Sequence, residues 1–379
     1  MFLKQASSLS AFVADKNILQ TMGNYNEMQL KQNELPEYVA KKIKVEDAVG
    51  TTLAHDITEI RPGAFKGPSF RKGYTVKQGD LCHLMRLGKR HLYILDLNED
   101  QIHEDQAVLE MATALAGPGV TFGSSPREGK LELKAIYDGL FKVQVDPLVE
   151  FNLMPDVMCA TIHNATPVIK GQTLGGTRAI PLVIEKESLE QALEIPRKAY
   201  PLLSVKSFQK VKAGLIITGS EVYDGLIEDR FQDIVEKKLI SFGSELADVV
   251  ILPDDQARIT AAVRDFLNRG LDMIVTTGGM SVDPDDVTRH GIRGAGVDEI
   301  YYGSGVLPGA MFQLAYKGST PIVGIPACAL YHEATIFDLV LPRLLAGERP
   351  DNVDLAKLAH GGLCLNCPTC RFPACTFGK

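Results

Sequence analysis

The pattern of hydrophobic positions changes near residue 212. Beyond that point, short apolar runs alternate with longer segments whose apolar residues recur every three or four positions. The apolar runs predict buried strands at residues 214–218, 248–252, 273–277 and 322–325. The intervening segments predict helices at residues 230–242, 256–268 and 331–345. Strands that are apolar on both faces and separated by helices imply an α/β domain with a doubly wound, mainly parallel sheet.

The first half of the chain carries mixed patterns. Residues 45–50 and 80–88 predict short helices that end at Gly50 and Gly88, and residues 52–57 and 93–95 predict strands. Further along, residues 104–116 and 186–193 predict helices, and residues 181–184 predict a strand. The alternation over residues 130–145 predicts a hairpin around Asp138-Gly139. Pro196 and Pro201 indicate a linker.

These patterns divide the chain into five regions. We expect a poorly ordered extension at 1–40, an α+β flanking domain at 41–103, an α+β middle domain at 104–204, the α/β domain at 205–348 and a Cys-rich tail at 349–379. No internal repeat accompanies this division.

Composition narrows the classes of partner. The 379 residues carry 47 acidic and 40 basic side chains, a net charge of −7, with no basic stripe. This argues against a nucleic-acid partner, although a compact phosphorylated ligand remains compatible with it. The longest apolar runs are too short to cross a bilayer, and no secretory signal pattern is seen at the N-terminus. We therefore expect a cytoplasmic protein without a membrane partner.

Three loops leave the carboxyl ends of the predicted parallel strands, where ligands of such sheets bind. The first contains Thr218, Gly219, Ser220 and Glu221 and runs on to Asp229, the second spans residues 276–286, and the third spans residues 325–329. In the second loop Gly278 and Gly279 allow a close backbone approach to an anion, and Thr276, Thr277 and Ser281 add hydroxyl donors. The loop therefore predicts a site for an anionic, phosphate-bearing small molecule.

The acidic residues of these loops have two interpretations. Asp283 directly precedes Pro284, which is typical of a helix N-cap. A carboxylate beside a bound phosphate is unfavourable unless a cation lies between them, so Asp286 is the better ligand for Mg²⁺, with Asp229 and Glu221 completing the site. The dinucleotide fingerprint and the phosphate loop ending in Gly-Lys-Ser/Thr are absent, and the segment around Ser281 lacks the second glycine of an esterase elbow.

A second candidate site lies at the end of the chain. Four of the seven cysteines (Cys364, Cys367, Cys370 and Cys375) follow one another at two-, two- and four-residue intervals. Four thiolates at this spacing can bind one tetrahedral zinc ion or ligate an iron–sulfur cluster. The first three have bacterial-ferredoxin spacing, but the last interval differs and no proline follows Cys375.

The order of the loops resembles a known family. The segments around Thr218–Asp229, residues 276–288, Leu307-Pro308-Gly309 and Gly324-Ile325-Pro326 are similar to the molybdopterin-binding domain of molybdenum cofactor biosynthesis proteins. Residues 46–56 and 79–94 resemble the flanking domain of the molybdopterin molybdenumtransferases. The resemblance implies that Gly278, Gly279 and Ser281 bind the phosphate or adenylate of molybdopterin, that Asp286 and Asp229 serve magnesium-assisted chemistry, and that Pro308, Gly309 and Pro326 line the pocket.

The resemblance also implies a reaction and partners. Molybdate would displace AMP from adenylated molybdopterin, a reaction governed by positioning and charge stabilisation. A homo-oligomer and a molybdoenzyme or another cofactor-biosynthesis protein are the partners it implies. The chain departs from the transferases at Ala327-Cys328-Ala329, where they have Gly-Asn-Pro, and lacks their Asp-Gly-Tyr-Ala segment. Two hypotheses follow: a molybdenumtransferase-like enzyme, or a carrier or sensor that binds molybdopterin without inserting metal.

Overall fold

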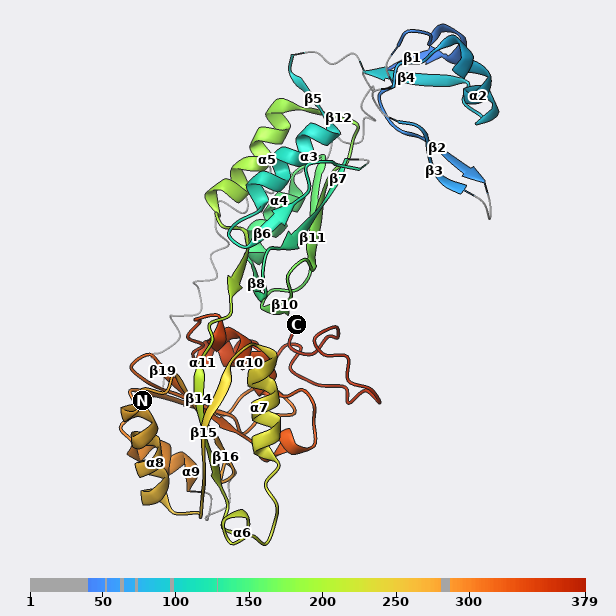
Figure 1. Cartoon of the computed structure of the whole chain (residues 1–379). Helices are drawn as coiled ribbons and strands as arrows, with labels where there is room; N and C mark the ends of the chain where they lie inside the picture. Colours follow the sequence, from blue (N-terminus) through green and yellow to red (C-terminus); the bar gives the residue numbers. More distant parts are fainter. Residues whose placement is uncertain are drawn as a thin grey trace, which may run out of the picture.

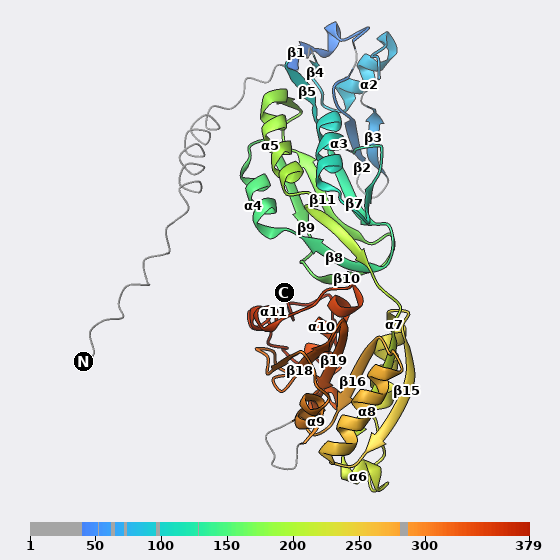
Figure 2. The same cartoon turned by 90° about the vertical axis from the view of Figure 1, so that its left-hand side faces the viewer.

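The chain folds into three blocks that follow one another along an elongated molecule (Figures 1 and 2). A computed structural model describes residues 40–51, 53–61, 65–71, 74–95, 99–127, 129–280 and 287–379. The predicted extension at 1–40 and the loop segment 281–286 lie outside this range, apart from Ala40. Within the described residues, no helix has the length and apolar character needed to cross a membrane.

The C-terminal block is built on a six-stranded sheet in the order β15-β14-β16-β19-β18-β17. Strands β14, β15, β16 and β19 run parallel, β18 pairs antiparallel with β19, and the edge strand β17 pairs antiparallel with β18. The strands span Lys212–Thr218 (β14), Glu245–Leu252 (β15), Met273–Thr277 (β16), Glu299–Tyr302 (β17), Gln313–Lys317 (β18) and Thr320–Ile325 (β19). The α/β prediction is confirmed, including the four parallel strands, whereas β18 has no predicted counterpart.

Helices cover both faces of this sheet. One face packs its apolar side chains against α7 and α10, and the other packs against α8 and α9 (Figure 1). The helices span Ser220–Tyr223 (α6), Phe231–Ser241 (α7), Gln256–Asn268 (α8), Thr288–Gly294 (α9), Ile336–Leu345 (α10) and Asn352–Lys357 (α11). The helix predicted at 331–345 begins at Ile336, because Thr335 caps it by accepting a hydrogen bond from Phe337 N. A short 3-10 helix, η3 (Ala327–Leu330), precedes it.

The middle block has its own hydrophobic core between two antiparallel sheets and three helices. One sheet has the order β6-β7-β11-β9 and the other β10-β8-β13. Its elements are β5 (Gln101–His103), α3 (Glu104–Leu115), β6 (Val120–Phe122), β7 (Lys130–Ala135), β8 (Gly139–Val143), α4 (Val145–Leu153), β9 (Val157–Thr161), β10 (Thr166–Val168), β11 (Thr173–Ala179), β12 (Val183–Glu185), α5 (Lys186–Lys198) and β13 (Leu203–Ser207).

Two predictions for this block are wrong. Strands β7 and β8 flank Asp138-Gly139, but they join different sheets instead of pairing as a hairpin. Pro196 lies inside the last turns of α5, and the segment after Pro201 continues as β13, which pairs with β8. The two prolines therefore do not mark a linker between blocks.

The N-terminal block is small. It pairs β1 (Ala40–Lys44) with β4 (His91–Leu95) and β2 (Ile57–Arg61) with β3 (Phe65–Phe70), around η1 (Val45–Asp47), η2 (Gln78–Asp80) and α2 (Leu81–Arg86). Gly50 and Gly88 both adopt the left-handed conformation expected of helix-ending glycines. The strand predicted at 52–57 is wrong, because the strand starts at Ile57 and residues 53–56 contribute only an isolated bridge at Leu53.

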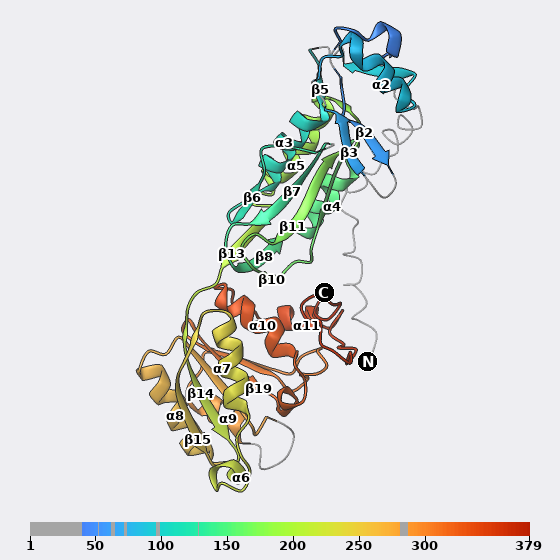
Figure 3. The same ribbon diagram turned by 45° about the vertical axis from the view of Figure 1, so that its right-hand side comes forward.

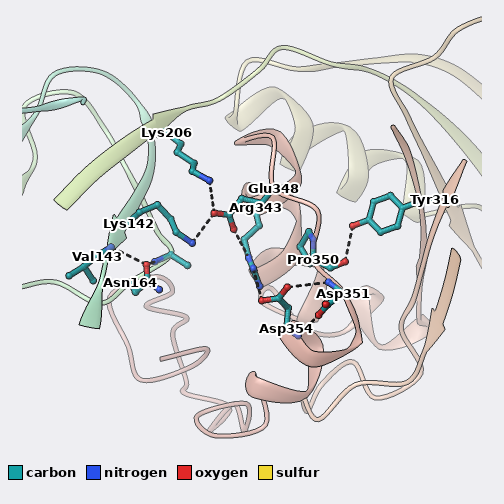
Figure 4. Close-up of polar contacts among 11 residues, drawn as sticks. Lys142, Val143, Asn164, Lys206, Tyr316, Arg343, Glu348, Pro350, Asp351 and Asp354 are labelled. Atoms are coloured by element: carbon teal, nitrogen blue, oxygen red, sulfur yellow. Dashed lines mark hydrogen bonds and ion pairs between the residues drawn. The ribbon is translucent and has the colours of Figure 1, made fainter. Parts of the chain in front are cut away.

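The middle and C-terminal blocks are joined by ion pairs. Glu348, which follows α10, binds Lys142 from β8 and Lys206 from β13, as well as Arg343 from α10 itself (Figure 4). The interface therefore connects two strands of the middle block to the end of one helix of the α/β domain.

Candidate functional site

The three predicted loops emerge at one edge of the sheet. Strands β14, β16 and β19 are parallel neighbours, so their last residues Thr218, Thr277 and Ile325 lie side by side. The three loops therefore leave the same edge of the sheet, as expected from the parallel order of their strands. The part of the second loop at 281–286, with Ser281, Asp283 and Asp286, lies outside the described residues.

Thr218 connects the first two loops. Its buried hydroxyl donates to Thr277 O at 2.9 Å and lies 2.8 Å from the hydroxyl of Thr288, the first residue of α9. Thr288 is fully buried as well. The Thr218 hydroxyl therefore joins the end of β16 to the first residue of α9.

Two consecutive glycines begin the second loop for a steric reason. Gly278 and Gly279 have φ values of +80° and +52°. A Cβ at Gly278 would collide with Thr218, and a Cβ at Gly279 would collide with the hydroxyl of Thr288. The close approach predicted for a ligand is therefore already made by the protein's own threonines, and the glycines let the loop pack against them.

The other hydroxyls of the site differ in their partners. Thr276 and Thr277 are fully buried. Thr276 donates to Val323 O across a long 3.5 Å, whereas the hydroxyl of Thr277 has no hydrogen-bond partner among the described residues. Thr277 is therefore the described hydroxyl of this loop that remains free for a ligand atom.

The carboxylate of Asp254, which follows β15, binds the start of the first loop. Ser220 donates both its backbone N–H and its hydroxyl to Asp254, at 2.8 and 3.1 Å, and Gly219 N donates to Leu252 O. Glu221 is exposed and lies against Gly219. Asp229 accepts from Phe231 N at 3.0 Å and from Gln232 N at 2.9 Å, so both of its oxygens cap α7. The catalytic role assigned to Asp229 stays a prediction.

The remaining predicted pocket residues are Pro308 and Gly309, in the turn before β18, and Pro326, directly after β19. Pro308 accepts from Ile336 N at 3.2 Å, and Gly309, with φ +133°, has no room for a Cβ because Ile336 lies against it. Pro326 is the N-cap of η3, the 3-10 helix formed by the third loop. Within that loop, burial raises the pKa of the Cys328 thiol.

Sequence reasoning missed a buried polar group beside these loops. Gln313, on β18, is fully buried, and neither atom of its amide has a hydrogen-bond partner in the described part of the chain. It is paired with Gly324, and Met280 lies against that glycine. A single polar residue in the apolar strand 312–316 is the signal that could have found it.

Arg289 and Tyr302 were missed as well, and nothing in the sequence pattern indicates them. The Arg289 guanidinium lies 4.2 Å from the centre of the Tyr302 ring, and the Tyr302 hydroxyl donates to Met280 O at 2.8 Å. The Nε of Arg289 is buried without a described partner. This stack places a positive charge beside the second loop, where an anionic ligand is predicted.

The magnesium, zinc and iron–sulfur assignments stay predictions. Among the described residues, no group of three or more His, Cys, Asp or Glu side chains is gathered so that it could hold a metal ion. For magnesium, Asp229 caps a helix and Asp254 binds Ser220, so the described acids alone do not form a site. The four tail cysteines are not disulfide-bonded, and all four line one cavity.

Comparisons with known proteins agree with the predicted resemblance. Residues 214–346 match the family described as a probable molybdopterin binding domain, and residues 42–96 match a family described as a domain of unknown function. A CinA-like protein of Mycobacterium tuberculosis is 40% identical over 77 residues, which is 20% of this chain and 18% of that protein. The chain thus covers about a fifth of the length of the curated relatives it matches.

Two solved structures are similar to part of the chain. The molybdopterin biosynthesis enzyme MoaB of Thermus thermophilus is 23% identical, with 37% of this chain and 98% of that chain covered and a TM-score of 0.32. The protein CinA of Thermoplasma acidophilum is 16% identical, with 36% and 98% covered and a TM-score of 0.33. The similarity of residues 214–346 to the probable molybdopterin binding domain therefore concerns the α/β domain and not the rest of the chain.

Proposed function

We propose that the protein binds adenylated molybdopterin at the carboxyl edge of its sheet and inserts molybdate with release of AMP. The observation that carries the proposal is the free hydroxyl of Thr277 beside Gly278, at the point where three loops of a molybdopterin-binding-type domain converge. Molybdate and the pterin are substrates here. Asp286 is the acid we propose for the magnesium ion that assists departure of AMP.

The described residues support binding by position and charge. Thr277 offers a hydroxyl to a phosphate oxygen, and Arg289 adds a positive charge where it is held by stacking on Tyr302. Thr218 and Thr288 contact each other through their hydroxyls, which holds the start of α9 beside the ends of β14 and β16. Preorganised donors of this kind stabilise developing charge without reorganisation.

A carrier or sensor is the second candidate. The specific observation in its favour is the sequence Ala327-Cys328-Ala329 in the third loop, folded as η3, at the position where the transferases have Gly-Asn-Pro. This substitution replaces an amide side chain with a thiol, so a polar contact to the ligand is lost. Binding without turnover is the expected behaviour of such a protein.

Two measurements on the full chain test the proposal. Purified protein is titrated with adenylated molybdopterin, and AMP release is then followed with and without molybdate. We expect tight binding, molybdate-dependent AMP release, and loss of release but not of binding in Asp286→Ala. Thr277→Val removes the free hydroxyl at nearly constant volume and should weaken binding about tenfold, which corresponds to the loss of one hydrogen bond to a charged group. Thr121→Val, at an exposed position of the middle block, is the control and should leave binding unchanged. Binding without AMP release in the native protein would favour the carrier, and no binding would refute both candidates.

A further inference from the structure

The last sixteen residues of the chain form a folded segment without a helix or strand. Residues 364–379, all of them described, contain turns and bends only. Two ends anchor the segment. Cys364 N donates to Leu307 O and Leu307 N donates to Gly362 O, both at 2.8 Å, and Gly378 N donates to Gly361 O at 2.9 Å. Phe377 is buried in the core of the α/β domain, and the chain ends beside α11 (Figure 3).

All four tail cysteines line one cavity between these anchors. The cavity has a volume of about 340 Å³, and its wall is completed by residues 331–334, which follow the third loop, and by Arg371. Three of the thiols are half-buried and Cys367 is exposed. Asn366 adopts a left-handed φ of +51°, so the chain turns between the first two cysteines. Four cysteines from one short segment therefore face a common space.

Zinc binding explains four cysteines in this short segment better than core packing does. Core packing needs apolar volume, which one or two cysteines supply, but four thiols within twelve residues supply the full ligand set of a tetrahedral structural zinc. Zinc with four thiolates carries a charge of −2, and Arg371 in the cavity wall places a positive charge beside it. The last interval of four residues departs from the three-residue spacing typical of ferredoxin clusters.

We propose that the four cysteines bind one structural Zn²⁺ that fixes the C-terminal segment against the turn at Leu307. No three of the thiols are gathered in the described structure, so binding includes closure of the turn that carries the exposed Cys367. Coupling between metal binding and local folding is general for small thiolate sites. The bridge from Cys364 to Leu307 then places the zinc centre next to Pro308 and Gly309. This proposal is independent of the ligand assigned to the α/β domain.

Metal analysis of the full chain tests the proposal directly. Protein purified under reducing, anaerobic conditions is expected to contain one zinc per chain, with the four tail thiols protected from a thiol reagent until zinc is removed, as read by peptide mass analysis. Replacement by Co²⁺ should give the absorption of a tetrahedral thiolate complex. Iron with sulfide, or four reactive tail thiols and no metal, would overturn the proposal.

Variants localise the ion. Cys367→Ser and Cys370→Ser should each reduce bound zinc to background, whereas Cys82→Ser, which alters an exposed cysteine on α2, should retain it. Zinc retained in a Cys367→Ser, Cys370→Ser double variant would contradict the assignment. Hydrogen exchange of the wild-type chain gives a readout that does not depend on the variants folding. Removal of zinc by a chelator should raise exchange at the amides of Leu307 and Cys364, and unchanged exchange there would contradict the proposed role.

Discussion

Glu348 is the residue on which the interface between the middle and C-terminal blocks depends. Its carboxylate accepts from Lys142 at 2.8 Å, from Lys206 at 3.0 Å and from Arg343 at 2.8 Å (Figure 4). Burial by itself would raise the pKa of Glu348, but the hydrogen bonds and charge of these three cations outweigh it and lower the pKa from 4.5 to about 2. The substitutions Glu348→Gln and Lys142→Met therefore perturb a charge pair that joins two blocks.

The pKa gives the size of the effect. A shift from 4.5 to about 2 corresponds to roughly 3 kcal/mol, at about 1.4 kcal/mol per unit. The Glu348 side chain is only 10% exposed, but Lys142 and Lys206 are 24% and 47% exposed, so solvent screens part of the attraction. We expect a coupling free energy between Lys142 and Glu348 of about 1–2 kcal/mol. Because the folded-state pKa is depressed, this stability is present above about pH 4.5 and is lost as the pH falls toward about 2.

A double-mutant cycle measures this coupling. Circular dichroism follows the urea unfolding of the wild type, both single variants and the double variant. Each curve is fitted with the number of unfolding transitions that the wild-type curve requires. Lys134 and Glu132, 3.5 Å apart and 47% and 52% exposed, provide a control pair within one strand, for which we expect less than about 0.5 kcal/mol. A coupling for Lys142 and Glu348 no larger than that of the control, or one that persists unchanged at pH 3, would refute this reasoning.

Three further predictions concern individual positions. Gly278→Ala should lower the free energy of unfolding by more than about 2 kcal/mol and abolish ligand binding, because the new Cβ collides with Thr218. Gly225→Ala is the control, since Gly225 has a similar φ of +74° but open space around it, and should lower the free energy of unfolding by about 1 kcal/mol. Equal losses in urea unfolding would contradict the steric argument. Gln313→Leu should change the free energy of unfolding by less than about 1 kcal/mol, since the Gln313 amide has no described partner. The same variant should weaken binding in a titration with adenylated molybdopterin. A decrease of several kcal/mol in the free energy of unfolding would show that the amide is hydrogen-bonded in the native protein. Burial raises the pKa of Cys159 to about 12, so iodoacetamide at pH 8 should leave it unmodified while the exposed Cys82 reacts, as read by peptide mass analysis; modification of both at one rate would contradict its burial.

Strands β14 and β16 were predictable because they are buried on both faces. After the exposed Lys212 at the start of β14, every residue of these two strands is buried, so the local pattern carries the tertiary information. The middle block lacks this property. Asp138-Gly139 is a local turn signal, but β7 and β8 take partners such as β11 and β13 that lie far along the chain. Alternation specifies a strand and not its neighbour, which is why the hairpin prediction is wrong.

In the candidate site, too, features set by the local sequence were predicted and features set by distant residues were missed. Gly278 and Gly279 were found from their place after a strand, because only glycine tolerates such backbone angles. The residues that demand those angles, Thr218 and Thr288, belong to other elements, and Thr288 was not singled out for this role. Gln313 and Arg289 were missed for a similar reason: their unpartnered atoms become evident only when the surrounding strands are in place.

Helix α10 belongs to both the site and the interface. At its first residue, Ile336 donates to Pro308 O and fills the space over Gly309. Toward its end, Arg343 binds Glu348 and thereby the two lysines of the middle block. Ten residues of helix span only about 15 Å, and a helix packed on a sheet moves as a unit. Helix α10 therefore contacts the turn at Pro308 with its first residue and the interface with the middle block near its end.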